Sequence, residues 1–468
     1  MNLLQPFIAE TTAPDSRIAI IAGNGDRASY ADIKERSSRL ASAWRKRGIS
    51  SGDRVLLAMP LGIPLYVSII ALWRLGAVIV FSEPALGLSG LRHAIAAACP
   101  KALLSQGWIS AVRHCMPVLW PMLQISPDDG DAGPEALEPV DDDHPALISF
   151  TSGSTGGPKM IIRGHGLLAH QNSCVSELLR SDREEVDLVA FPMFVLANLA
   201  LGVTSVLPNW NLRRHDMANP KCVGEHIGKH GVTRALIPPS NCKKLVQYPG
   251  VSLRTIFTGG GPVFPDLLKQ LTASAAEIVT IYGSTEAEPI AHQRVRDITD
   301  SDWEKMRTGG GLLAGRPIPE IRLRIMNHEI VVTGPHVSKG YCNAADDAGT
   351  KTRLGNEIWH RTGDAGTLDA DGRLWLLGRM DGCAAGRFPF AIEAAARFWP
   401  GVSNAALISI DGESVLAIEG HRASRGLWQE QAKQICDARV VAIERMPLDR
   451  RHRSKIDYPA LRGLLRAA

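Results

Sequence analysis

The apolar residues between positions 29 and 48 recur at the spacing of an α-helix. Ile33, Leu40 and Trp44 fall near one face, while the charged residues of the segment lie elsewhere. Gly48 suits the end of such a helix because glycine readily adopts the left-handed conformation found there. The pattern therefore predicts a helix over 29–48.

Shorter apolar runs follow this helix. The runs at 54–59 and 77–81 have the length and composition of buried strands, and the run at 63–75 between them has helix length. An order of strand, helix and strand is typical of a parallel sheet covered by helices. We expect the first part of the chain to be α/β.

A stretch rich in Asp, Pro and Gly at 127–143 predicts a surface connection with solvated charges. Beyond it lie a helical pattern around 166–179 and an apolar stretch at 188–207. Strand-like runs at 234–238 and 255–258 come next. These segments predict a second α/β unit.

From Arg322 the pattern changes to short strands separated by Gly, Asn and Asp, which indicates a small β-rich subdomain. The tail after Arg379 carries its own helix and strands, enough for a small mobile lid. The strands of the subdomain are expected at 323–326, 329–333 and 374–377, and those of the tail at 405–410 and 415–418, after a helix at 392–398.

The length of 468 residues exceeds the size at which one hydrophobic core keeps growing, so more than one domain is expected. We predict an α/β protein with a large N-terminal domain, residues 1–378, built from α/β subdomains and the β-rich subdomain. A small mobile α+β domain, residues 379–468, follows it.

Composition narrows the possible partners. A net charge of +4 from 52 basic and 48 acidic residues is too small to indicate nucleic-acid binding, which requires a concentrated basic face. With 45% hydrophobic and 21% charged residues the chain has the composition of a soluble globular protein. Any polyanion that it binds is therefore expected to be small.

The sequence features that bear on localisation predict a cytoplasmic protein. The eight cysteines are scattered without a Cys-x-x-Cys pair, as expected for thiols in a reducing compartment. The first residues lack the basic start and apolar core of a signal peptide. Pro60, Pro64 and Arg74 interrupt the longest apolar region, so no membrane span is expected.

The ten residues Phe-Thr-Ser-Gly-Ser-Thr-Gly-Gly-Pro-Lys at 150–159 combine hydroxyls, glycines and one cation. A polyphosphate offers many acceptor oxygens, so its site needs hydroxyl donors and small residues that let backbone N–H groups converge. Lys159 adds a mobile positive charge. We predict a loop that binds nucleotide phosphates through Thr151, Ser152, Gly153, Ser154, Thr155 and Gly156.

The spacing separates this loop from the P-loop of kinases and GTPases. That motif places Ser or Thr after Gly-Lys, whereas here Pro158 precedes Lys159 and Met160 follows it. The alternative is an ordinary Ser/Gly turn between strands at 146–150 and 160–162.

A second segment, Ile-Tyr-Gly-Ser-Thr-Glu-Ala at 281–287, joins an apolar strand to a polar turn. Tyr282 can lie against adenine with Gly283 beside it, Thr285 can donate to a phosphate oxygen, and Glu286 can hold Mg²⁺, because hard cations prefer carboxylate oxygen. A strand-ending turn with a solvated glutamate is the alternative for this peptide alone.

Two charged turns, His-Arg-Thr-Gly-Asp at 360–364 and Gly-Arg-Met-Asp at 378–381, flank the strand at 374–377. Together with 151–159, their order and spacing strongly resemble the acyl-adenylate-forming superfamily: acyl-CoA synthetases, peptide-synthetase adenylation domains and firefly luciferase. The resemblance covers nearly the whole chain, as far as Ser-Lys-Ile-Asp at 454–457.

The resemblance implies a role for each matching position. Asp364 and Arg379 bind ribose, Asp381 is the hinge between domains, and Lys455 engages ATP and the carboxylate during adenylation. A solvent-exposed basic tail is the alternative for Lys455. The adenine-side loop is Gly-Gly-Gly-Pro at 259–262, which resembles the family's Gly-Gly-Ala-Pro and supplies Gly260, Gly261 and Pro262.

The resemblance also implies two half-reactions. A small-molecule carboxylic acid attacks the α-phosphate of Mg²⁺-bound ATP to give acyl-AMP and pyrophosphate, and a nucleophile then displaces AMP. CoA is the expected acceptor. Carboxylate and phosphate repel each other, so Lys455, Lys159, Thr285 and Glu286 with its metal are expected to offset the developing charge.

The chain departs from the family in two places. The segment at 382–393 is short and lacks the usual lysine of the part that forms the pantetheine tunnel in CoA ligases. The predicted substrate side, with Phe191, Phe194 and Asn198, lacks the histidine found there in many acyl-CoA synthetases. Its apolar character suits an uncharged acyl group, although core packing explains any one of these side chains equally well.

Around 191–198 and at its ending the chain is similar to olefin β-lactone synthetases, in which the hydroxyl of a β-hydroxy acid displaces AMP. Transfer of the acyl group to an acyl carrier protein or to an amine fits the short 382–393 segment equally well. A non-catalytic adenylate-binding protein is the alternative from another class, and retention of Lys455 argues against it.

Overall fold

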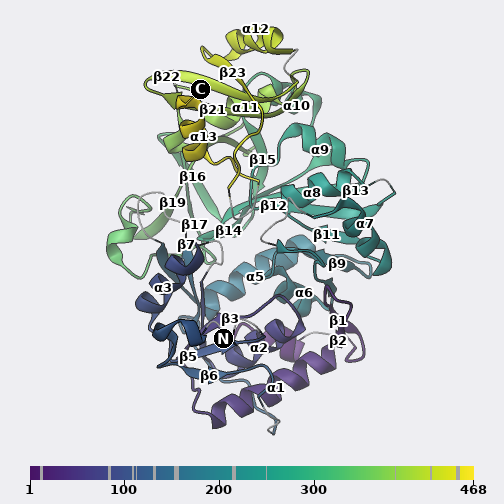
Figure 1. Ribbon diagram of the computed structural model, residues 1–468, viewed down its shortest axis with the longest axis vertical. Helices are drawn as coiled ribbons and strands as arrows, with labels where there is room; N and C mark the ends of the chain where they lie inside the picture. Colours follow the sequence, from purple (N-terminus) through teal and green to yellow (C-terminus); the bar gives the residue numbers. More distant parts are fainter. Residues whose placement is uncertain are drawn as a thin grey trace. The chain divides into compact units, whose positions relative to one another are not determined.

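The computed structural model divides into two compact units (Figure 1). Unit 1 comprises Met1–Asn209 and Pro335–Lys351, and unit 2 comprises Trp210–Gly334 and Thr352–Ala468. This division differs from the boundary expected between residues 378 and 379, which stays a prediction. The structure describes residues 1–10, 14–82, 86–107, 110–111, 113–129, 133–151, 158–212, 218–248, 250–384, 386–421, 424–449 and 454–467.

One sheet of unit 1 has the strand order β6-β5-β3-β4-β7-β8. Its strands pair in parallel except for β7 and β8, which form an antiparallel hairpin. Helices α2 and α3 contact β4. The expected parallel sheet is thus confirmed. The strands are β3 (Arg54–Ala58), β4 (Val78–Phe81), β5 (Ala102–Ser105), β6 (Leu123–Ile125), β7 (Pro145–Thr151) and β8 (Lys159–Gly164), and the helices α2 (Ile63–Arg74) and α3 (Gly87–Ala98).

Helix α1 (Tyr30–Lys46) lies within the segment predicted to be helical. It begins with a capping box, because the Ser29 hydroxyl accepts from the Asp32 N–H while the Asp32 carboxylate accepts from the Ser29 N–H. Ile33 and Trp44 are fully buried, and α1 packs on α2. The apolar stripe seen in the sequence therefore faces the core.

A second group of strands in unit 1 has the order β9-β10-β1-β2. β9, β10 and β1 pair in parallel, and β2 is antiparallel to β1. Helices α5 and α6 pack on each other, and the N-terminal π-helical turn contacts α6. The elements are the π-helix Pro6–Glu10, β1 (Ile18–Ile21), β2 (Arg27–Ser29), α5 (His165–Leu179), β9 (Val186–Val189), α6 (Phe194–Leu201) and β10 (Thr204–Val206).

The large sheet of unit 2 has the order β16-β17-β19-β20-β15-β14-β13-β12-β11. β11, β12 and β13 are parallel, and the remaining pairs are antiparallel, so the parallel part continues directly into the expected β-rich part. The strands are β11 (Arg234–Leu236), β12 (Leu253–Gly259), β13 (Ala275–Ser284), β14 (Ala287–Arg294), β15 (Leu312–Pro317), β16 (Arg322–Met326), β17 (Glu329–Thr333), β19 (Glu357–Leu368) and β20 (Leu374–Arg379), with β18 (Lys351–Leu354) at the unit boundary.

Four helices accompany this sheet, and α8 packs against α9. Proline at the first or second position begins three of them, where a missing N–H costs nothing. The helices are α7 (Pro220–Lys229), α8 (Pro239–Val246), α9 (Pro265–Leu271) and α10 (Asp300–Arg307).

The last part of unit 2 is a three-stranded sheet, β21-β22-β23, with helices packed on it. Trp399 and Trp428 anchor its core. The expected helix and strands of the tail are confirmed, with shifted ends. The elements are α11 (Pro389–Ala396), β21 (Val402–Ile410), β22 (Glu413–Gly420), α12 (Arg425–Ile435), β23 (Arg439–Ile443) and α13 (Tyr458–Arg466).

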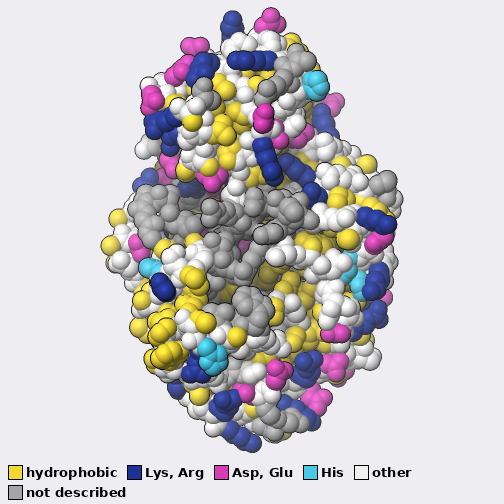
Figure 2. Space-filling view, in the orientation of Figure 1, with side chains coloured by type: hydrophobic (Ala, Val, Ile, Leu, Met, Phe, Trp, Pro, Cys, Tyr) yellow, Lys and Arg dark blue, Asp and Glu magenta, His cyan; other side chains and the backbone are white. Residues whose placement is uncertain are grey.

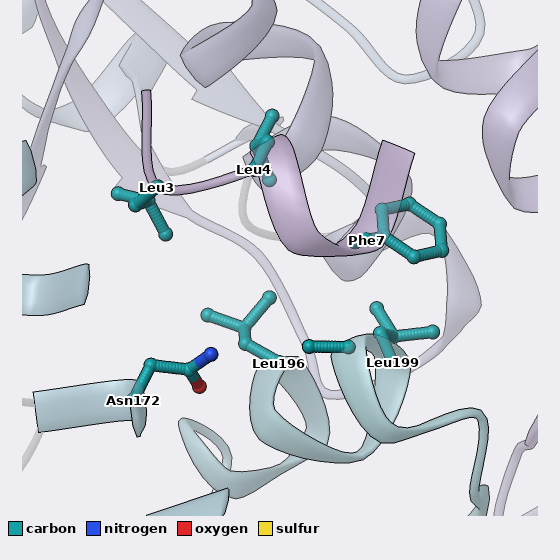
Figure 3. Close-up of a pocket in the computed structure, with 7 residues that line it drawn as sticks. Leu3, Leu4, Phe7, Asn172, Leu196 and Leu199 are labelled. Atoms are coloured by element: carbon teal, nitrogen blue, oxygen red, sulfur yellow. The ribbon is translucent and has the colours of Figure 1, made fainter. Parts of the chain in front are cut away.

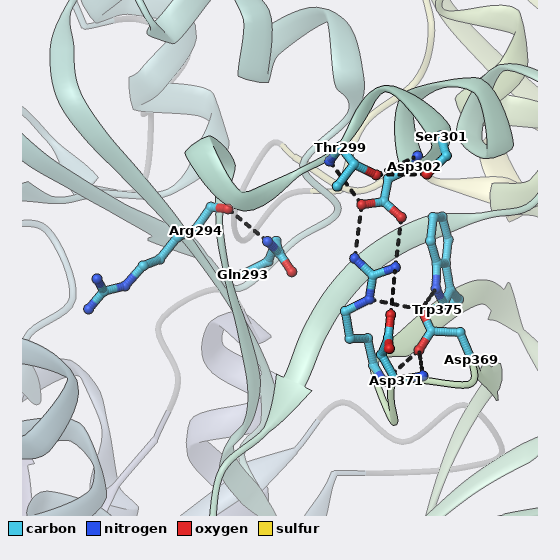
Figure 4. A network of polar contacts seen from close by, with 9 residues as sticks. Gln293, Arg294, Thr299, Ser301, Asp302, Asp369, Asp371 and Trp375 are labelled. Atoms are coloured by element: carbon cyan, nitrogen blue, oxygen red, sulfur yellow. Dashed lines mark hydrogen bonds and ion pairs between the residues drawn. The ribbon is translucent and has the colours of Figure 1, made fainter.

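A buried ionic network ties α10 to the β19–β20 hairpin (Figure 4). Arg373 donates to both carboxylate oxygens of Asp302, at 2.9 and 2.8 Å, and to Asp369 at 2.9 Å. The Trp375 indole also donates to Asp369, at 3.0 Å. The network fixes the strands that carry two predicted site residues, Asp364 and Arg379.

Charges of both signs intermingle on the face shown in Figure 2, as the small net charge leads one to expect. Within the described ranges, the chain has no helix that is both long and apolar enough to cross a membrane.

Candidate active site

The predicted phosphate loop connects two strands of a hairpin. β7 ends at Thr151 and β8 begins at Lys159, and these two residues are cross-strand partners. The flanking strands expected at 146–150 and 160–162 are therefore present. The side chain of Thr151, together with Ser152, Gly153, Ser154, Thr155 and Gly156, lies outside the described residues, so their contacts with phosphate stay predictions.

Lys159 lies against a segment from a distant part of the sequence. Its Nζ donates to the carbonyl oxygen of Asp346 at 3.2 Å and lies 5.2 Å from the centre of the Tyr341 ring. The Cys342 N–H donates to the carbonyl of Met160 at 3.0 Å, which joins the same segment to β8. The 3₁₀ turn Ala344–Asp347 thus helps to fix the position of the Lys159 ammonium group.

Unit 2 brings three predicted nucleotide residues together. Asp364 and Arg379 are cross-strand partners of β19 and β20, and Arg379 donates to Asp364 Oδ1 at 3.1 Å. The hydroxyl of Tyr282, near the end of β13, donates to Asp364 Oδ2 at 2.8 Å. The sequence predicted Tyr282 as an adenine contact and did not predict this hydrogen bond. A carboxylate held at both oxygens is well oriented to accept from ribose hydroxyls.

The pKa values in this cluster reflect burial and charge. Burial, and then the Asp364 carboxylate, raise the pKa of Tyr282 well above that of a free phenol, so the hydroxyl remains a donor. Burial lowers the pKa of Arg379, but the nearby Asp364 carboxylate outweighs it, and the net pKa is raised. Tyr282 is therefore neutral and Arg379 cationic over the physiological pH range.

Glu329 supports the turn before Asp364, a role that the sequence reasoning missed. This buried carboxylate accepts from the Gly363 N–H at 3.0 Å and from Arg361 at 2.7 Å. Gly363 has a φ of +70°, and a Cβ there would lie 2.6 Å from the Arg379 guanidinium. The only sequence signal was a glutamate at the start of an otherwise apolar strand.

Thr285 and Glu286 form the turn between β13 and β14. Gly283 leaves room for this turn, since a Cβ there would approach the Ala287 carbonyl to 3.0 Å. Glu286 is mostly buried. Among the described residues no three His, Cys, Asp or Glu side chains cluster as a metal cage. Mg²⁺ bound to a nucleotide is usually held by one or two carboxylates together with substrate phosphates and water, and the binding of Mg²⁺ by Glu286 stays a prediction.

The segment that carries Lys455 lies beside the predicted adenine-side loop. β12 ends at Gly259, and Gly260 follows with a φ of +74°. A Cβ on Gly261 would approach Ser454 Cβ to 3.0 Å and Lys455 Cγ to 3.8 Å. Glycine in place of the alanine expected from the resemblance thus leaves space for this close contact. The structure therefore brings Gly261 and Lys455 together, although 193 residues lie between them in the sequence.

Asp381 lies in the 3₁₀ turn Met380–Gly382, between β20 and α11. Its carboxylate is 4.0 Å from Arg379 Nε and largely exposed. The position between the large sheet and the last helices agrees with what a hinge requires, and the hinge role stays a prediction.

The residues predicted for the acyl pocket lie in and beside α6. The Phe191 and Phe194 rings are 5.4 Å apart. Asn198 is fully buried, donates to the Ser205 hydroxyl at 3.0 Å, and its backbone carbonyl accepts from Tyr30. These contacts give Asn198 a structural role, and its contact with an acyl group stays a prediction.

A separate apolar pocket lies between the N-terminal segment and α6 (Figure 3). Leu3, Leu4 and Phe7 line one side and Leu196 and Leu199 the other, with Asn172 at the edge. Positions 196 and 199 lie on a different part of the helix surface from 194 and 198. The pocket in Figure 3 is therefore distinct from the predicted acyl site.

Comparison with known proteins assigns the family. Residues 9–342 match the AMP-binding enzyme family, which is more than half of the chain. The chain belongs to the AMP-binding enzyme family. This AMP-binding enzyme is an AMP-forming ligase, as are relatives named as CoA ligases and synthetases.

Two curated relatives cover most of the AMP-binding chain. An olefin β-lactone synthetase of Xanthomonas campestris pv. campestris is 27% identical, over 92% of this chain and 89% of the relative. A feruloyl-CoA synthase of an Amycolatopsis species is 30% identical, over 82% and 81%. ATP-bound MatB from Rhodopseudomonas palustris has the same fold, with a TM-score of 0.81, 22% identity, and coverage of 99% of this chain and 98% of that chain.

Proposed function

We propose that this AMP-binding enzyme activates a small-molecule carboxylic acid as acyl-AMP and then transfers the acyl group to CoA. The observation that supports it most directly is the arrangement in unit 2. A carboxylate suited to ribose is held by Tyr282 and Arg379, and the Lys455 segment packs against Gly261 at the end of β12. These contacts, all within unit 2, support the proposal that the residues around Asp364 bind the nucleotide and that Lys455 acts beside them.

The chemistry requires positive charge where an anionic carboxylate approaches an anionic phosphate. Lys455 is proposed to bring its ammonium to the reacting oxygens, which offsets the charge and aligns the attack. Lys159 is proposed to hold the outer phosphates. Mg²⁺ held by Glu286 and phosphate oxygens would neutralise further charge. No side chain needs to form a covalent intermediate.

CoA is the first candidate acceptor because relatives named as CoA synthases and ligases cover more than four fifths of this chain. A hydroxyl of the substrate itself is the second candidate. It is favoured by olefin β-lactone synthetases matching 92% and 93% of the chain, and by the short 382–393 segment. Loading of a carrier protein is the third, since a salicyl-AMP ligase that is also a salicyl-S-ArCP synthetase matches 86% of the chain.

Lys455→Ala tests the adenylation step. We expect acyl-AMP formation, measured as exchange between ATP and labelled pyrophosphate, to fall about 100-fold or more, the scale on which lost charge stabilisation acts. ATP binding, measured by calorimetry, should change little. Lys433→Ala, at an exposed lysine of α12, is the control and should behave as wild type. Unchanged exchange in Lys455→Ala would refute the proposed role of Lys455, and a wild-type protein that binds ATP without exchange would be a non-catalytic binder.

The acceptor is tested by mass spectrometry of the products. The enzyme is incubated with ATP, Mg²⁺ and a panel of fatty, aryl and β-hydroxy acids, each with and without CoA. An acyl-CoA that forms only when CoA is present supports the first candidate. A β-lactone formed without CoA would replace it with the second. Acyl-AMP that accumulates beside unreacted CoA would direct the search to a carrier protein.

A further inference from the structure

Lys455 lies on the returning arm of a hairpin. Leu448 and Ile456 form an antiparallel bridge, and the Asp449 N–H donates to the Lys455 carbonyl at 2.8 Å. The Asp449 carboxylate accepts from the Lys455 N–H at 2.9 Å. Asp457 closes the hairpin through its N–H, which donates to the Pro447 carbonyl at 2.9 Å. The backbone of Lys455 is therefore held firmly to the opposite arm.

A second contact holds the residues just after the lysine. The Tyr458 hydroxyl, at the start of α13, donates to Glu393 Oε1 at 2.7 Å. The same oxygen accepts from the Leu407 N–H of β21 at 3.0 Å. Glu393 belongs to α11 and is fully buried. One carboxylate oxygen thus joins three separate elements.

Helix α11 is also the first helix after the Met380–Gly382 turn, which carries the predicted hinge residue Asp381. The contact between Glu393 and Tyr458 therefore connects the Lys455 hairpin to the helix closest to that turn. Tyr458 and Ile456 also pack on the apolar cluster that contains Leu461.

We propose that Glu393 and Tyr458 are positioning residues for Lys455, and that their hydrogen bond sets where the lysine meets the reacting carboxylate and phosphate. This inference rests on the proposed adenylation. It assigns the pair to the adenylation half-reaction alone, because the second half-reaction is not proposed to use Lys455.

The physical reason lies in the lysine side chain. A lysine has a flexible four-carbon stem, so its ammonium is aimed mainly through the placement of its backbone. The hairpin fixes the Lys455 backbone relative to residues 447–449, and the Tyr458 contact fixes the whole hairpin relative to α11. A displacement of about 1 Å at a reacting group costs up to roughly 100-fold in rate.

Tyr458→Phe removes one hydroxyl and keeps the ring in the apolar cluster. We expect the kcat of ATP–pyrophosphate exchange to fall about tenfold, as for one hydrogen bond expressed in the transition state. The KM for ATP should stay within about twofold, since the pair does not touch the nucleotide cluster. The second half-reaction of the variant, measured with separately supplied acyl-AMP and the acceptor, should proceed at the wild-type rate.

Two further variants separate positioning from stability. Leu461→Val weakens the packing of α13 without touching the hydrogen bond, and it should retain exchange. Glu393→Gln keeps a carbonyl oxygen that can accept from both Tyr458 and Leu407, so it should retain most of the exchange rate. If Leu461→Val and Tyr458→Phe lose exchange equally, or if both half-reactions slow together in Tyr458→Phe, the pair is merely structural and the proposal fails.

A double-mutant cycle gives the final test. In a Lys455→Ala background, single-turnover formation of acyl-AMP should be no slower when Tyr458→Phe is added, because the positioned group is already missing. A further tenfold loss would show that Tyr458 acts independently of Lys455. If the wild-type protein shows no exchange with any acid, the proposed adenylation fails first. If the wild-type protein shows exchange and Tyr458→Phe leaves the exchange rate unchanged, only the positioning role is overturned.

Discussion

At the scale of residues, Asp364 is the centre of the best-defined part of the site. Its two carboxylate oxygens accept from different strands, Oδ1 from Arg379 of β20 and Oδ2 from Tyr282 of β13. The backbone of its turn is held in place by Glu329. The orientation of the Asp364 carboxylate thus depends on Glu329 and Tyr282, which are 35 and 82 positions away in the sequence. It also depends on Arg379, its cross-strand partner.

We expect Asp364→Asn to raise the KM for ATP about tenfold, because a charged acceptor becomes a neutral one and Arg379 loses the nearer of its two ion partners. The assay is ATP–pyrophosphate exchange at varied ATP. Asp371→Asn, at an exposed carboxylate in the same β19–β20 hairpin, is the matched control and should leave this KM unchanged. An unaltered KM in Asp364→Asn would rule out its contact with ATP.

Glu393 gives the protein a pH-dependent stability. Burial raises its pKa to about 7, opposed in part by hydrogen bonds from Tyr458 and Leu407 and by the charge of Arg397. Asp381 is the other charged group that acts on this pair, through Tyr458. Since the folded state holds the proton more tightly than the unfolded state, this contribution to stability is complete below about pH 4.5. It is lost as the pH rises through 7.

Urea unfolding over a pH series tests this with Glu393→Gln, which cannot titrate. Relative to the variant, the wild type should lose on the order of 3 kcal/mol of unfolding free energy between about pH 4.5 and 7.5. Other carboxylates titrate in both proteins, so the difference isolates position 393. A constant difference across this range would mean that the carboxyl group ionises normally.

At the scale of elements, turns and hairpins carry the predicted site residues of each unit, and strands and helices hold these turns in place. Lys159 follows the β7–β8 hairpin loop, Glu286 lies in the β13–β14 turn, and Lys455 lies in the last hairpin. Each hairpin is extended by a strand of a larger sheet or packed on one. The ionic network around Arg373 holds the β19–β20 hairpin in place against α10 (Figure 4).

Removing the Arg373 cation from this network should lower the stability of the folded protein. Arg373→Met leaves the buried Asp302 carboxylate and Asp369 without their partner, which we expect to lower the free energy of unfolding by about 3 kcal/mol. Arg439→Met, at an exposed pair with Glu413, should cost less than about 1 kcal/mol. Chemical denaturation at pH 7 measures both, and equal losses would contradict the argument.

The pH dependence of this network has the opposite sign to that of Glu393. Burial raises the pKa of Asp369, but hydrogen bonds from Trp375 and Arg373 outweigh it and lower the pKa to about 2. The stabilisation is therefore present above about pH 3.8 and is lost as the pH falls through 2. The effect of Arg373→Met should persist at mildly acidic pH.

At the scale of the whole molecule, the chain forms two compact units, each assembled from segments that are not contiguous in sequence. Residues 335–351 belong to the first unit although they follow much of the second. This interleaving explains why Lys159 contacts Asp346 and Tyr341, which lie far from it in the sequence. Linear order alone does not reveal such interleaving, and the domain boundary expected between residues 378 and 379 stays a prediction.

The amino-acid sequence alone determined the element types and the family, and it predicted the nucleotide residues, because these depend on local periodicity and on short motifs with a fixed chemical requirement. The tertiary structure decided which of those residues meet. The Tyr282 hydroxyl binds Asp364, Glu329 supports the turn at Gly363, and Tyr458 binds Glu393. These contacts join residues far apart in sequence through sheet register and helix packing, and register and packing are properties of the folded chain.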